Sequence, residues 1–126
     1  MRHLTRACPR QAQFTRWNDA LQTRNKTEVA NLYASDDLSF LPTVEPKMLS
    51  SRPETLGYFT EFLKKEPSGV LLQDKVHACG PDGFVHSGLY NFTTNGGPVP
   101  ARFSYLWKKQ SDGSWKIMHH HSSKLP

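Results

Sequence analysis

The sequence has few of the features that mark secreted, metal-binding or membrane proteins. Only two of its 126 residues are cysteines, Cys8 and Cys79, which are too few for a disulfide framework and do not fit the spacing of a zinc motif. No apolar run is long enough to span a bilayer, and no secretory segment follows Met1. We therefore expect two reduced thiols in a cytoplasmic protein that does not interact with membranes.

Motifs for common cofactor and nucleophile chemistry are also missing. There is no G-x-G-x-x-G, Walker loop, G-x-S-x-G or paired C-x-x-C. Three consecutive histidines, from His119 to His121, suggest metal ligands, but neighbours on a strand point to opposite faces. Only His119 and His121 would converge, and two imidazoles without a third ligand make a weak site. We expect no cofactor and no metal.

Acidic residues are scarce at the start of the chain. Six basic residues between Arg2 and Lys26 face only Asp19 and Glu28 in the first 30 residues, and the formal net charge is +5. A basic N-terminal segment of this kind is compatible with binding to nucleic acid, to an acidic partner or to a membrane surface, and it also resembles an organelle transit peptide. No RNA-binding aromatic signature accompanies it, so nucleic acid is disfavoured. We expect residues 1–9 to be irregular because Pro9 disfavours a helix; organelle targeting stays open.

The first half of the chain predicts helices. Phe14, Trp17 and Leu21 recur at helical spacing between residues 10 and 24. A second short helix is expected at about 27–33, capped by Thr27, and a third at about 52–65, capped by Ser51. A strand at 38–43 lies between them.

The second half predicts long strands joined by turns. The strands span about 70–79, 84–94, 99–109 and 114–123, and Gly-containing turns lie between them. Helices followed by consecutive strands indicate an α+β fold with helices on one face of an antiparallel sheet. The length suits a single domain, residues 10–126.

Several motifs carry a family resemblance. W-N-D-A-L-Q-T starts at Trp17, L-Y-A-S-D-D at Leu32, L-P-T-V at Leu41, Y-F-x-x-F-L at Tyr58 and W-x-I-x-H-x-H-x-S at Trp115. Together they resemble the association (hub) domain of calcium/calmodulin-dependent protein kinase II and stand-alone bacterial hub-like proteins. These belong to the nuclear transport factor 2-like superfamily, with SnoaL-like cyclases and ketosteroid isomerase. The resemblance covers roughly residues 10–124.

The resemblance implies both a fold and a function. The fold is a cone-shaped, curved antiparallel sheet wrapped around the N-terminal helix, with an internal pocket. The function is an oligomerisation module that assembles dimers of itself into a closed ring, with a kinase or other attached domain as a further partner. Calmodulin binding is implied for the family only, since this chain shows no kinase domain and no calmodulin-binding helix.

The final two strands carry large groups on both faces. A lone sheet would leave some of them in water, and a monomer rarely exposes a large apolar patch. The resemblance matches His119 and His121 to histidines on the face that hub domains use for packing. The expected oligomer interface comprises Leu106, Trp107, His119 and His121.

The opposite face, with His120, is expected to line the pocket. A bulge near Pro100 would be needed to turn Arg102 inward. Kinase hub domains carry arginines at positions that match Gly88, Tyr105 and Ser122, so the resemblance transfers no anion site. The expected pocket residues are Trp17, Tyr58, Tyr90, Arg102, Tyr105 and His120.

A histidine among tyrosines also suits acid–base catalysis. The enzymes of the superfamily use an Asp or Glu as base, and we find no carboxylate among the inward sheet positions. Asp36 and Asp37 are better explained as loop and cap residues, while Glu61 stays a candidate. We therefore expect no catalytic residues. The alternative is a dimeric SnoaL-like small-molecule-binding protein or an enzyme of the isomerase or cyclase type.

Overall fold

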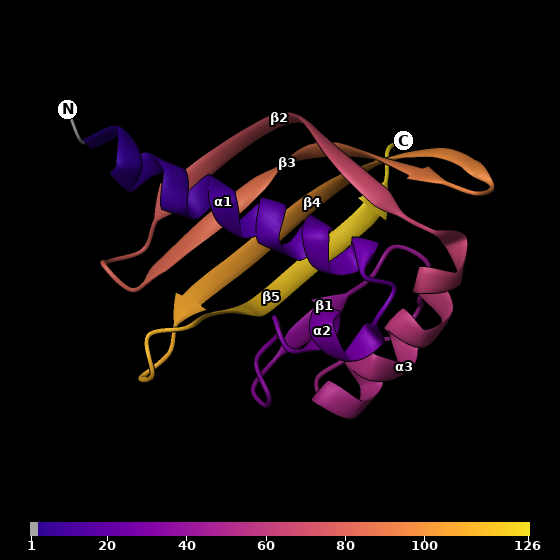
Figure 1. Cartoon of the computed structure of the whole chain (residues 1–126), viewed down its shortest axis with the longest axis horizontal. Helices are drawn as coiled ribbons and strands as arrows, with labels where there is room; N and C mark the ends of the chain where they lie inside the picture. The colour runs from indigo at the N-terminus through magenta and orange to yellow at the C-terminus, as the bar shows by residue number, and fades with distance from the viewer. Residues whose placement is uncertain (1–2) are drawn as a thin grey trace.

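One curved sheet with helices on its concave face forms the protein (Figure 1). The computed structural model describes residues 3–126, with side chains from Arg10 onward. Four long strands form successive antiparallel hairpins: β2 (Ser68–Ala78), β3 (Gly83–Thr94), β4 (Gly97–Lys109) and β5 (Trp115–Lys124). A short strand, β1 (Ser39–Leu41), pairs in parallel with β5, so the order is β1-β5-β4-β3-β2. The predicted α+β cone is confirmed, and the sheet is unclosed.

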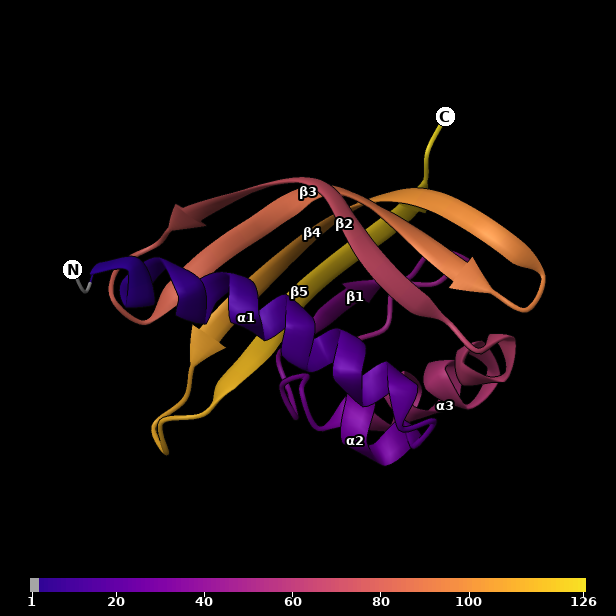
Figure 2. The same ribbon diagram turned by 45° about the horizontal axis from the view of Figure 1, so that its top comes forward.

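The curved sheet forms an arch over the first helix (Figure 2). Two bulges and one close approach between the backbones of neighbouring strands accompany this curvature. The register of β2 against β3 shifts between Leu71 and Gln73. Nearby, a Cβ on Gly88 would lie 2.0 Å from the carbonyl oxygen of Gln73, so a side chain does not fit there. A second shift, opposite Leu106 and Trp107, sits in β5. Bulges of this kind bend a strand and increase its twist.

The first helix, α1 (His3–Gln22), crosses the concave face (Figures 1 and 2). Phe14, Trp17 and Leu21 form its buried stripe, as their spacing predicts. The prediction of an irregular N-terminus is wrong for residues 3–9, which are helical. Proline has a φ angle compatible with a helix, so Pro9 removes one hydrogen bond from the ladder without ending it. Residues 1 and 2 lie outside the described part.

Two further helices close one end of the cone. Asn25, rather than Thr27, caps α2 (Lys26–Ala30), because its side chain accepts from the N–H of Thr27 at 2.9 Å. Ser51 caps α3 (Arg52–Phe62) as predicted, and a single 3₁₀ turn, η1 (Leu63–Lys65), follows. None of the helices within residues 3–126 has the length and apolarity needed to cross a membrane.

The core lies between α1 and the concave face, and it contains Trp107. We predicted this residue at an oligomer interface, which is wrong, because Trp107 is fully buried. Period-2 alternation puts it on the same face as Phe103 and Tyr105. Its register partner Ile117 is also in the core. Strict alternation along the strand would put Ile117 on the outer face with His119, but Met118 is an extra residue between Ile117 and His119 at the register shift.

Candidate functional site

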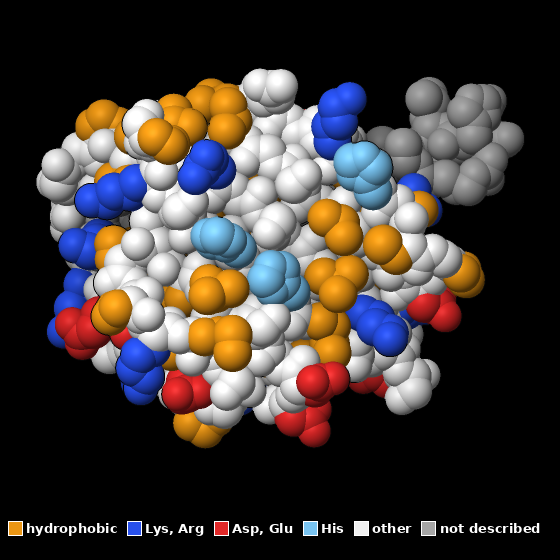
Figure 3. All heavy atoms as spheres, turned by 180° about the vertical axis from the view of Figure 1, so that it is seen from behind, with side chains coloured by type: hydrophobic (Ala, Val, Ile, Leu, Met, Phe, Trp, Pro, Cys, Tyr) orange, Lys and Arg blue, Asp and Glu red, His pale blue; other side chains and the backbone are white. Residues whose placement is uncertain are grey.

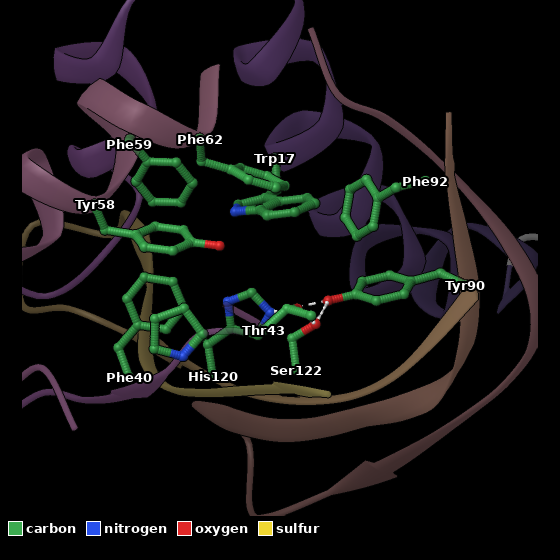
Figure 4. Close-up of a pocket in the computed structure, with 11 residues that line it drawn as sticks. Trp17, Phe40, Thr43, Tyr58, Phe59, Phe62, Tyr90, Phe92, His120 and Ser122 are labelled. Atoms are coloured by element: carbon green, nitrogen blue, oxygen red, sulfur yellow. Dashed lines mark hydrogen bonds between the residues drawn. The ribbon is translucent and has the colours of Figure 1, made fainter. Parts of the chain in front are cut away.

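The concave face holds a narrow cavity between the sheet, α1 and α3 (Figure 4). The space open to the centre of a water molecule is about 10 Å³, which is room for about one water. Its apolar wall is mostly aromatic, and its polar groups come from β5, β3, α3 and the segment after β1. The principal lining residues are Trp17, Phe40, Thr43, Tyr58, Tyr90, His120 and Ser122.

His120 is held between two aromatic rings from the neighbouring strands. Phe40 of β1 and Tyr105 of β4 are its register partners. The His120 ring lies 5.0 Å from Phe40 at an interplanar angle of 8°, and 4.1 Å from Tyr105 at 20°. This stacking fixes the plane of the imidazole, so its nitrogens point along the sheet surface toward hydroxyl groups.

Both nitrogens of His120 face tyrosine hydroxyls. Nδ1 lies 2.8 Å from the Tyr33 oxygen, and Nε2 lies 3.4 Å from the Tyr90 oxygen. The indole N–H of Trp17 donates to Tyr33 at 3.1 Å. Because an indole nitrogen only donates, the Tyr33 oxygen accepts this bond, and its own proton is available for Nδ1. The proton of a neutral His120 then resides on Nε2.

Burial keeps this histidine neutral. Desolvation lowers the pKa of His120 well below its ordinary value, and the neighbouring His119 and His121 add smaller effects in the same direction. Burial likewise raises the pKa of Tyr33 and Tyr90. The polar groups around His120 are therefore uncharged near neutral pH.

The hydrogen-bond chain continues to the edge of the cavity. Tyr90 donates to Ser122 Oγ at 2.6 Å, and Thr43 donates to the same oxygen at 2.5 Å. Tyr58 differs from these groups, because its hydroxyl points into the cavity (Figure 4) and has no hydrogen-bond partner among the described residues. Burial, and to a smaller degree Glu45, raises the pKa of Tyr58, so it stays a neutral donor. It is free to bond to a molecule in the cavity.

Four of the six predicted pocket residues, Trp17, Tyr58, Tyr90 and His120, line the cavity. Tyr105 is on the correct face but does not line it, because its ring stacks on the ring of His120, which lies between it and the cavity. Arg102 is wrong, because it is exposed on the opposite face of the sheet. Its pairing with Leu89 shows that β4 keeps a regular register past Pro100, so no bulge turns it inward.

Several lining residues, among them Phe40 and Thr43, and one carboxylate were missed. Phe40 and Thr43 reach the cavity because β1 pairs in parallel with β5, which no short-range signal in the sequence reveals. Asp74 lies on β2 with its Oδ2 2.7 Å from His86 Nε2, so the expectation of no inward carboxylate on the sheet is wrong. Alternation along β3 places His86 on the same face as Tyr90, but the bulge in β2 hides from the sequence which way Asp74 faces. The pair lies outside the lining of the cavity.

The convex face of the sheet carries the other candidate residues. Figure 3 shows histidine side chains between hydrophobic ones on this face. Leu106 and His119 are half-buried and His121 is exposed, and His119 Nδ1 lies 2.8 Å from Ser39 Oγ. Burial, then His121, lowers the pKa of His119. These three predicted interface residues therefore share one surface, which Trp107 does not reach.

A curved, unclosed sheet wrapped around an N-terminal helix is the fold of the nuclear transport factor 2-like proteins. The family model of the calcium/calmodulin dependent protein kinase II association domain matches residues 11–126. The chain belongs to this family. No curated protein matches the sequence significantly.

Solved structures agree with this membership. A protein from Xanthomonas campestris, named as a calcium/calmodulin dependent protein kinase II association domain, is 40% identical with a TM-score of 0.86, over 92% of this chain and 85% of that one. A protein from Streptomyces avermitilis, named as a dehydratase of the NTF2-like family, is 20% identical with a TM-score of 0.75, over 89% and 90%. A ketosteroid isomerase-like protein from Erwinia carotovora atroseptica is 14% identical with a TM-score of 0.73, over 92% and 93%. The last two show the fold alone.

Proposed function

We propose that the chain is a self-association module and that its convex sheet face packs against a second copy. The observation that carries this proposal is the composition of that face around Leu106, His119 and His121. By register, Val85 pairs with Leu106 and Ser87 with Ser104, next to His119 and His121, and none of these side chains on the convex face is a lysine, arginine or carboxylate. Arg102, which pairs with Leu89, adds one positive charge at the side of this patch near His121. The centre of the patch is nevertheless free of such charges. Uncharged, partly apolar surface of this kind suits a two-fold contact between identical faces. Membership of an association-domain family supports the same partner.

A ring needs a second, different contact, and the free edge of the sheet supports one. β2 is a terminal strand in the order, so its outer backbone groups lack a strand partner. On it, Val70 and Leu72 are 57% and 62% exposed. We infer that dimers formed through the convex face meet laterally near this edge, because two distinct interfaces close a ring when the rotation between copies allows it.

Sedimentation and light scattering of the full chain test this function. Leu106→Glu places a charge at the centre of the convex face and should reduce the particle to a smaller species. Lys26→Glu, an exposed change at the start of α2, is the matched control and should leave the particle mass unchanged. A wild-type monomer at micromolar concentration and neutral pH would refute self-association, and a simple dimer would refute the ring.

A second candidate function is binding of a small molecule at the cavity without turnover. The unpartnered Tyr58 hydroxyl, aimed into the cavity, favours it. Both His120 nitrogens already face hydroxyls, and no carboxylate lines the cavity, so an available general base is lacking. Conversion of an enone or lactone that is lost in His120→Gln would instead establish the isomerase- or cyclase-type alternative.

A further inference from the structure

A small hollow on the convex face lies on the opposite side of the sheet from the cavity. Its volume is about 180 Å³. The lining residues are Arg102, Phe103 and Ser104 of β4 and His121 and Ser123 of β5. The side chain of Phe103 is buried in the core, so only its backbone reaches the hollow. The wall is therefore made by four polar side chains from two neighbouring strands.

Strand pairing sets these four side chains at the corners of a rectangle. Arg102 pairs with Ser123, and Ser104 pairs with His121. Residues two apart on a strand lie roughly 7 Å apart on the same face, and directly opposed residues lie about 5 Å apart. The four groups therefore converge on one small area, which suits a compact ligand that accepts hydrogen bonds from several directions.

All four side chains have hydrogen-bond donors to offer. Arg102 carries five N–H groups in a fixed fork, each serine has one O–H, and a neutral His121 has one N–H. Within the described part of the chain, none of the four side chains forms a hydrogen bond or an ion pair. Arg102 and His121 are exposed, and the two serines are half-buried. These donors are thus open to a ligand from solution.

The hollow also favours negative charge. Arg102 carries the one permanent charge of the lining, and no described Asp or Glu lines the hollow. In Figure 3, basic side chains lie beside the histidines of this face, whereas the acidic ones lie in its lower part. An anion in the hollow would therefore gain a cation without competing with a carboxylate of the chain itself.

The arrangement of donors favours phosphate over a carboxylate. The two oxygens of a carboxylate lie in one plane, and the fork of Arg102 alone would satisfy them. The tetrahedral oxygens of a phosphate can accept from the arginine and from both serines at once. A phosphate monoester has a second pKa of about 6, so it is mostly a dianion at pH 7.5. No apolar side chain lines the hollow that would bind a hydrocarbon body instead.

We propose that this hollow binds a phosphate group, either as inorganic phosphate or as the head of a phosphate monoester. Arg102 forms a bidentate contact with two oxygens, and the hydroxyls of Ser104 and Ser123 donate to the others. The ester oxygen points away from the sheet. The proposal does not depend on either candidate function, because it uses neither the cavity nor Leu106 at the centre of the convex patch.

Calorimetric titration of the full chain in phosphate-free buffer at pH 7.5 tests the proposal. The probes are inorganic phosphate and methyl phosphate, and acetate is the carboxylate control. At least one phosphate probe should bind at least about tenfold more tightly than acetate. Binding of inorganic phosphate alone would identify the free ion as the ligand, and tighter binding of methyl phosphate would identify a monoester.

Variants of Arg102 separate a built site from general attraction to a basic protein. Arg102→Gln should weaken phosphate binding at least about tenfold, and Arg102→Lys, which keeps the charge but loses the fork, at least about threefold. Lys75→Gln is the matched control, because Lys75 is exposed on the same face by register but lies outside the hollow. It also removes one positive charge, yet it should change the affinity less than about twofold.

A double variant tests the hydroxyls. Ser104→Ala with Ser123→Ala should lower the preference for phosphate over acetate at least about threefold, and sedimentation of each variant should match the wild type. Equal losses in Arg102→Gln and Lys75→Gln would show diffuse attraction and overturn the site. Acetate that binds as tightly as both phosphate probes, or no binding of either probe at about 10 mM, would also reject it. None of these results bears on self-association, which sedimentation measures separately.

Discussion

His120 stacks on Tyr105, its cross-strand neighbour, with ring centroids 4.1 Å apart and an interplanar angle of 20°. Both rings are buried, and the Tyr105 hydroxyl has no hydrogen-bond partner within the described part of the chain, whereas the two nitrogens of His120 face Tyr33 and Tyr90. The two members of this pair therefore differ: the nitrogens of His120 have hydroxyl partners, and the Tyr105 hydroxyl does not. We expect the two residues to respond differently to substitution and to pH.

The first prediction concerns pH and stability. Burial lowers the pKa of His120 well below its ordinary value. Above about pH 6.5 neither state binds a proton at this site, but below it the unfolded chain does and the folded one does not. The free energy of unfolding should therefore fall as the pH drops from 7 toward 5, by at most about 1.4 kcal/mol per pH unit from this group.

Urea denaturation at several pH values measures this dependence. His120→Gln should flatten the slope below pH 6.5, whereas His77→Gln, a change at an exposed strand residue, should leave it unchanged. A wild-type slope equal to that of His120→Gln would show that His120 titrates normally in the folded protein.

The second prediction compares two buried tyrosines. Tyr105→Phe removes an unpartnered hydroxyl and should be neutral or stabilise the protein by up to about 1 kcal/mol. Tyr33→Phe leaves Trp17 Nε1 and His120 Nδ1 without their shared partner and should cost about 1–3 kcal/mol. Chemical denaturation of both variants provides the measurement, and equal losses would contradict the hydrogen-bond assignment.

The third prediction concerns the bend between β2 and β3. Gly88→Ala should lower the free energy of unfolding by about 1–3 kcal/mol or more, because the added Cβ would lie 2.0 Å from the Gln73 carbonyl oxygen. Gly57→Ala, inside α3 with nothing within 4 Å of its Cβ, should instead stabilise by up to about 1 kcal/mol. Thermal unfolding compares the two, and a neutral Gly88→Ala would show that the strands can separate there.

The fourth prediction links pH to assembly. Burial, then His121, lowers the pKa of His119. If a second copy covers this face, protonation of the half-buried His119 in acid should weaken association, because a charged imidazole is costly to desolvate. Sedimentation at pH 7.5 and pH 5 should show a smaller particle at the lower pH, and the double variant His119→Gln and His121→Gln should lose this difference. A large particle that is unchanged at pH 5 would exclude the histidines from the interface.

Strand alternation carried most of what the sequence predicts correctly. It places Tyr90, Tyr105 and His120 on one face and His119 and His121 on the other, as the structure has them. Helical spacing likewise identifies the buried Trp17. These patterns are local, so a few neighbouring residues suffice to read them.

The errors share a different origin. The bulge at Met118 turns Ile117 inward, and no composition signal marks it. The reach of Phe40 to the cavity depends on a strand at the other end of the sequence. Asp74 faces His86 only because β2 gains a residue just before it. Each depends on how two strands meet, which the residues of one strand alone do not encode.

The parallel pairing of β1 with β5 has a consequence for synthesis on the ribosome. Ser39 meets His119, a partner 80 residues later, and β5 follows all the other elements of the fold in the chain. Until β5 has been made, the segment around Phe40 has only its local backbone pairing with Leu49, and the helices have only part of a wall to cover. The contacts that complete this part of the cone are therefore long-range ones, which form late and leave apolar surface open in the meantime.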